Sequence, residues 1–167
     1  GELVPVRRRM GFLFQGSALF DSMTVEENVL FPLEEHRYGA LARRRERCRQ
    51  VLSMVGLDGM QKRYPEELSG GQKKRVALAR AVALDPANLE AWLLLGYDLH
   101  ELGRNEEALA AGESARRADP ANPRAWTLLA IVQRDLGRAE EALESLERAL
   151  GLEPGNAEAW FEKGLAE

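Results

Sequence analysis

The second half of the chain repeats its hydrophobic pattern with a fixed period. Tryptophans at positions 92, 126 and 160 are spaced 34 residues apart, and residues 89–122 and 123–156 share 15 identities in 34 aligned positions. After Trp92, apolar side chains recur three and four residues apart, at Leu95 and Leu99, which is typical of one face of an amphipathic helix. The period predicts a repeated helix–turn–helix unit.

Glycine and proline divide each repeat at matching places. Gly103 and Gly137 follow the first apolar stripe, where a left-handed residue is expected to end a helix. The turns at 120–122 and 154–156 place a proline that ends the second helix, followed by an asparagine that can cap the next helix. Each repeat is therefore predicted to be a pair of helices.

The first half has no such period. The apolar run Met10–Phe14 predicts one short buried strand, and Thr24 begins a capping box that opens a helix to about His36. A second helix is predicted over residues 41–55 and a third over residues 69–84. The predicted fold class is mainly α, with at most one short strand near the N-terminus.

Charge also divides the chain in two. Residues 1–85 carry 15 Lys and Arg against 11 Asp and Glu, whereas residues 86–167 carry 8 against 16. The arginines lack interleaved aromatic residues, so we expect solvated helix faces and no nucleic-acid binding. The single cysteine, Cys48, and the lack of an apolar span of about 20 residues indicate a cytoplasmic protein.

The run Leu68-Ser69-Gly70-Gly71-Gln72 is the ABC ATPase signature motif. The surrounding residues 8–86 resemble the ATP-binding subunit of ABC transporters, of the type that handles lipids or organic solvents. The resemblance implies that Gln15 is the Q-loop glutamine. It also implies that Ser69, Gly70, Gly71 and Gln72 lie where the signature helix faces the γ-phosphate of ATP bound by an opposite subunit. Glycine there leaves room for the phosphate.

The motifs that hold nucleotide are missing. No G-x-x-x-x-G-K-[ST] occurs in the sequence, and after Pro86 the chain continues into Trp92 instead of an apolar strand ending in Asp-Glu. No histidine has the context of the family's switch histidine. We therefore predict no enzyme activity, no cofactor and no metal site, with the signature retaining only vestigial nucleotide contacts.

Residues 86–167 resemble the tetratricopeptide repeat family. The resemblance implies a helical stack whose concave groove takes a peptide or protein partner. By that analogy the groove is lined by Glu90, Leu93, Tyr97, His100, Arg124, Thr127, Ile131 and Arg134. Gly112 stands where the family has a large residue, from which we expect looser packing in the first full repeat.

The two resemblances meet within one helix. The predicted domains are 1–86, an ABC helical-subdomain fragment, and 87–167, two full repeats and a truncated third, with the signature helix 69–84 shared as the second helix of a preceding repeat. Because Trp160 and its apolar neighbours have no following mate, self-association through the C-terminal helix is expected.

The sequence predicts a non-catalytic peptide-binding or scaffold module, arising as a natural fusion or as an engineered or recombined chimera. The alternative is a fragment of an ABC ATP-binding subunit that contributes only its signature motif to a composite nucleotide site. It would then reach a membrane only indirectly, through a transporter permease. A protein without a biological role is a third possibility.

Overall fold

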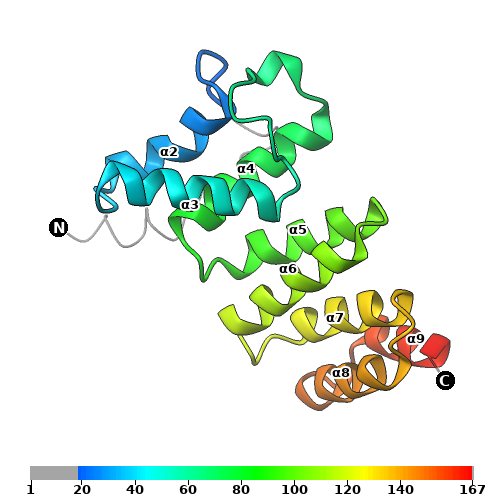
Figure 1. Cartoon of the computed structure of the whole chain (residues 1–167). Coiled ribbons are helices and arrows are strands. Elements are labelled where there is room, and N and C mark those ends of the chain that lie inside the picture. Colours follow the sequence, from blue (N-terminus) through cyan, green and yellow to red (C-terminus); the bar gives the residue numbers. More distant parts are fainter. Residues whose placement is uncertain (1–18, 167) are drawn as a thin grey trace. The chain divides into compact units, whose positions relative to one another are not determined.

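The computed structural model describes residues 19–166, and every regular element in that range is a helix. The mainly α fold class is therefore confirmed. The predicted strand Met10–Phe14 lies outside the described residues. The chain divides into two compact units, residues 1–88 and 89–167 (Figure 1).

Between residues 19 and 88, the described part of the first unit, there are three α-helices and one short turn of 3-10 helix. They are α2 (Val25–Glu35), α3 (Leu41–Met54), η1 (Pro65–Glu67) and α4 (Gly70–Leu84). The three α-helices pack against one another. Most of their buried side chains are aliphatic, and Val29, Leu33, Val51, Leu52 and Val76 are fully buried. The helices predicted to open at Thr24 and to span residues 41–55 and 69–84 are all present.

A buried asparagine organises the entry to α2. The Asn28 side chain accepts a hydrogen bond from the Phe20 N–H at 2.8 Å and donates to the carbonyl oxygens of Phe20, Met23 and Thr24 at 3.1, 3.0 and 3.0 Å. The predicted capping box is formed by Thr24 and Glu27. Because buried polar groups are costly unless bonded, Asn28 ties the loop 20–24 to the helix.

The second unit, as described to residue 166, consists of two helix pairs and a fifth helix. They are α5 (Leu89–Glu101), α6 (Asn105–Ala118), α7 (Pro123–Asp135), α8 (Ala139–Leu152) and α9 (Ala157–Ala166). Gly103 and Gly137 have φ values of 70° and 75°, as predicted for residues that end the first helix of each pair. The N–H groups of Gly103 and Arg104 bond to the carbonyls of His100 and Leu99, the pattern of a Schellman motif.

Leu128 and Leu129 of α7 pack against glycines of the preceding repeat. A Cβ atom built on Gly96 would overlap a methyl group of Leu128, and one built on Gly112 would lie 2.9 Å from Leu129. The space left by Gly112 is therefore filled by α7. Packing is tight at Gly112 itself, because a leucine from the next repeat occupies the space of the missing side chain. That the first full repeat is looser than the second stays a prediction.

One buried polar pair lies inside the second hairpin. Gln133 and Ser145 are 7% and 5% exposed, and their side chains are 2.7 Å apart. With its amide nitrogen turned toward the interior, Gln133 also donates to the carbonyl oxygens of Leu129 and Glu141, both at 3.2 Å. Gln133 thus has hydrogen-bond partners on both α7 and α8.

The tryptophans are held by a repeated contact. The indole N–H of Trp126 donates to the Pro120 carbonyl, and that of Trp160 donates to the Pro154 carbonyl, both at 2.9 Å. This contact explains why an aromatic residue with a polar tip suits the position. On α9, however, Trp160, Phe161 and Leu165 are 55%, 65% and 55% exposed.

Candidate functional site

The first helices of the repeats, α5, α7 and α9, pack side by side. Their polar and aromatic side chains form a surface that we call the first-helix face. It consists of Glu90, Tyr97, His100, Arg124, Arg134, Asp135, Glu158 and Glu162. Contacts between the helices build it, and each joins residues 28 to 35 positions apart.

At one end of the face, Arg124 of α7 holds Glu90 of α5. Its two terminal nitrogens lie 2.9 and 3.3 Å from the two carboxylate oxygens, the fork geometry of a bidentate pair. Glu158 is the residue 34 positions after Arg124 and lies on α9, where it is exposed. The period therefore places an acid, a base and an acid at equivalent positions of three helices.

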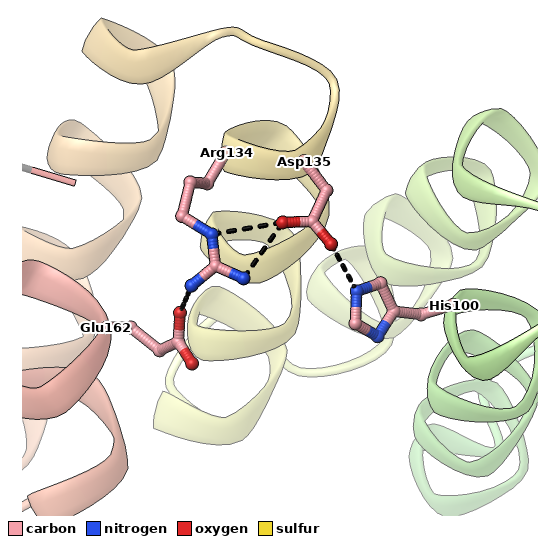
Figure 2. A network of polar contacts seen from close by, with 4 residues as sticks. All are labelled: His100, Arg134, Asp135 and Glu162. Atoms are coloured by element: carbon pink, nitrogen blue, oxygen red, sulfur yellow. Dashed lines mark hydrogen bonds and ion pairs between the residues drawn. The ribbon is translucent and has the colours of Figure 1, made fainter. Parts of the chain in front are cut away.

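A chain of polar contacts crosses the other end of the face. Figure 2 shows His100 of α5 pointing toward Asp135 of α7, with Arg134 between Asp135 and Glu162 of α9. His100 Nε2 lies 2.7 Å from Asp135 Oδ2, and the Arg134 guanidinium bonds both Asp135, at 2.8 Å, and Glu162. Three helices are thus connected through four side chains.

The electrostatics of Asp135 follow from these contacts. Partial burial acts to raise the pKa of Asp135, but hydrogen bonds from His100 and Arg134 outweigh it, and the pKa is lowered. The carboxylate of Asp135 is therefore ionised at neutral pH and holds both partners. Arg134, on the same helix as Asp135, also forms an ion pair with Glu162.

Tyr97 lies between the two ends and is half-buried. Burial raises the pKa of Tyr97 to about 12, and the carboxylates of Glu158 and Glu162 add to this effect, while Arg124 opposes it. Tyr97 is consequently a neutral phenol that can donate a hydrogen bond. Its surroundings carry more negative than positive charge.

Three of the eight predicted groove residues lie in the interior. Leu93 and Thr127 are fully buried and Ile131 is 6% exposed. The Thr127 hydroxyl is bonded to the Pro123 carbonyl at 3.1 Å, so its polar group is already satisfied. These three side chains therefore belong to the core of the repeat unit. Glu90, Tyr97, His100, Arg124 and Arg134 retain exposed surface, and their role as a groove lining stays a prediction.

Sequence reasoning did not include Asp135, Glu158 and Glu162. The period supplied a signal for Glu158, because it lies 34 residues after Arg124, and extension of the pattern into the third repeat would have found it. Asp135 directly follows the predicted residue Arg134. Glu162 directly follows position 161, which is 34 residues after the predicted residue Thr127. Only the packing of α7 between α5 and α9 brings their carboxylates to His100 and Arg134.

The signature residues open α4. Ser69 is its N-cap: its hydroxyl accepts from the Gln72 N–H at 3.2 Å, and the Gln72 side chain accepts from the Ser69 N–H at 2.9 Å. Gly70 and Gly71 are exposed, and a Cβ atom on either would meet nothing within 4 Å. Neither glycine is required by packing. Gln15 lies outside the described residues.

Residues 19–166 contain no group of three or more His, Cys, Asp or Glu side chains placed to hold a metal ion. No helix within this range is long and apolar enough to cross a membrane.

Two family models match the chain. The ABC transporter model matches residues 2–89, and the tetratricopeptide repeat model matches residues 89–132 and 123–166. The change from one family to the other therefore falls at the boundary between the two compact units, residues 88 and 89.

The curated relatives are ATP-binding proteins of transport systems. The sulfate/thiosulfate import ATP-binding protein CysA of Nocardia farcinica is 50% identical over 84 residues, which are 50% of this chain and 25% of that protein. The methionine import ATP-binding protein MetN of Symbiobacterium thermophilum is 51% identical over 86 residues, 52% of this chain and 26% of that protein. The chain thus spans about a quarter of the length of these relatives, and the predicted lipid or solvent type stays a prediction.

The similar solved structures are repeat proteins. The Arabidopsis OM64 TPR domain has a TM-score of 0.53 at 20% identity, covering 73% of this chain and 95% of that one. The first TPR domain of Spaghetti (RPAP3), bound to an HSP90 peptide, has a TM-score of 0.52 at 19% identity, covering 72% and 90%. At these identities the likeness shows the fold alone. From the two family matches and this fold, the chain belongs to the ABC transporter ATP-binding family over residues 2–89 and continues as tetratricopeptide repeats over residues 89–166.

Proposed function

We propose that this chain is a non-catalytic module that binds a peptide segment of a partner protein on the first-helix face. The observation that carries the proposal is the continuity of that face: side chains from α5, α7 and α9 are joined by ion pairs across three helices. A surface held in this way is pre-organised, which lowers the entropic cost of binding. The tetratricopeptide fold and the peptide-bound structural neighbour support the same class of function.

Selection from a random peptide library on the immobilised chain tests this function. We expect selected peptides to lose about tenfold or more in affinity with Tyr97→Ala, because aromatic side chains dominate binding surfaces. Arg148→Ala is the control, because Arg148 is exposed on α8, the second helix of its pair. This variant is expected to bind the peptides normally. Peptides that bind both variants as tightly as the parent would place the site elsewhere.

We further propose that the chain does not hydrolyse ATP. The sequence has no phosphate loop and no acidic pair for magnesium, and the Ser69 and Gln72 side chains cap their own helix. Phosphoryl transfer depends on positioning and charge stabilisation by those missing groups. We expect no phosphate release above background and no retention of labelled ATP in equilibrium dialysis of the chain alone. Hydrolysis by the pure chain would contradict this proposal.

A composite nucleotide site is the second candidate function. The observation that favours it is the empty space around Gly70 and Gly71. Packing within this chain does not require glycine at either position, so another function can account for them. With an ABC subunit that carries its own phosphate loop, dialysis would then show ATP retention that depends on this chain. Gly71→Ala is the matched variant, because it fits the fold but places a methyl group where a phosphate would approach. An unchanged result with Gly71→Ala would remove this candidate.

We also propose an origin, an assembly and a location for this chain. A fusion or chimera origin, with domains 1–86 and 87–167 and the helix 69–84 shared between families, is supported by the abrupt change of family match at residue 89. Self-association through the C-terminal helix is supported by Trp160, which is exposed on α9. A cytoplasmic location, with any membrane contact through a permease, follows the ABC relatives.

A further inference from the structure

The two arginines of the first-helix face are already occupied. Arg124 forms a bidentate pair with Glu90, and Arg134 is bonded to Asp135 and Glu162. An acidic partner would have to displace one of these carboxylates and leave it unpaired. Because replacing one ion pair by another gains little, such a partner has a small net advantage on this face.

The face has an excess of carboxylates. It carries four acidic side chains and two arginines. Glu158 is the acid without an ion pair within 4.0 Å among residues 19–166, and its side chain is exposed on α9. The negative charge of Glu158 also acts on Tyr97 of α5 and contributes to the increase in the pKa of Tyr97.

Apolar surface lies directly beside this acid. Phe161 and Leu165 follow Glu158 at three and seven positions on the same helix, so the three side chains share one side of α9. Phe161 is 65% exposed and Leu165 is 55% exposed. A carboxylate next to two exposed apolar side chains is complementary to a peptide in which a cationic residue adjoins a bulky apolar residue.

We propose that the first-helix face, together with the adjoining Phe161 and Leu165 of α9, selects peptides in which lysine or arginine adjoins a bulky apolar residue. Glu158 receives the cation, and Phe161 and Leu165 receive the apolar group. This inference rests on the proposed peptide-binding function and names the class of its ligand. The internal pairing of Arg124 and Arg134 excludes acidic peptides from the preferred class.

Two labelled synthetic peptides test the inference by fluorescence anisotropy on the full chain. One places lysines beside leucine and phenylalanine, and the other carries glutamate at each lysine position. We expect the lysine peptide to bind about tenfold tighter or more at low ionic strength, with the difference shrinking as salt is added. Glu158→Lys is expected to abolish the preference.

Glu147→Lys provides the matched control, since it makes the same charge change at an exposed position of α8. If it reduces the preference as much as Glu158→Lys, the attraction is a general effect of net charge and the assignment to Glu158 is overturned. Tighter binding of the glutamate peptide would overturn the ligand class and leave peptide binding intact. Binding of neither peptide, while library selection yields binders of another composition, would also refute the ligand class.

Discussion

Replacing Leu128 with alanine is expected to lower the free energy of unfolding of the repeat unit by about 2–5 kcal/mol. Leu128 is fully buried and fills the space beside Gly96 on the neighbouring helix α5. Its removal leaves a cavity between the two repeats. All three tryptophans lie in residues 89–167, so tryptophan fluorescence during denaturant unfolding reports on this unit.

A second substitution shows whether the effect arises at this contact. In the parent chain, Gly96→Ala gains about 1 kcal/mol of helix propensity but loses roughly 1–3 kcal/mol to overlap with Leu128. In the Leu128→Ala background the overlap is gone, and Gly96→Ala should be stabilising. The equivalent glycine of the third repeat, Gly164, has open space around it, so Gly164→Ala is the control without overlap. Additive effects of the two substitutions would contradict the proposed contact.

Replacing Asn28 with leucine is expected to destabilise the first unit by about 2–4 kcal/mol. The change removes one accepted and three donated hydrogen bonds and leaves the Phe20 N–H and the Met23 carbonyl oxygen without their partner. The carbonyls of Phe20 and Thr24 keep their backbone bonds from the Met23 and Asn28 N–H groups. Because this unit contains no tryptophan, hydrogen exchange is the suitable measurement. The Phe20 amide and the first turn of α2 should exchange much faster in the variant.

The same measurement on Glu35→Gln supplies the control. Glu35 is exposed at the end of α2, and substitutions at such positions change stability by about 0.5 kcal/mol or less. Unaltered protection of Phe20 in Asn28→Leu would show that the loop 20–24 is held by other contacts, such as the edge-to-face packing of Phe20 on Phe31.

Local signals made the helices predictable. The capping pairs Thr24 with Glu27 and Ser69 with Gln72 involve residues three apart, and each begins a helix in the structure. The positive φ of Gly103 and Gly137 depends on residues within one turn. Such features are visible in a sequence because the atoms that interact are close along the chain.

Burial within the repeats was harder to predict, because it depends on what the next repeat places against each residue. Leu93 and Thr127 occupy equivalent positions and were expected to line a groove, yet both are fully buried. Gly112 was expected to leave a gap, but Leu129 from the next helix pair fills it. Composition could not show this, since complementary packing is a property of two surfaces.

By itself, the sequence determined the two families, the helical fold and the position of each helix, because period, caps and turn residues act over short distances. Tertiary structure alone decided which charges meet. Asp135 contacts His100 and Glu162 contacts Arg134 because α7 lies between α5 and α9, and these partners are 35 and 28 residues apart. Electrostatic energy depends on distance in space, and that distance exists only once the helices have packed.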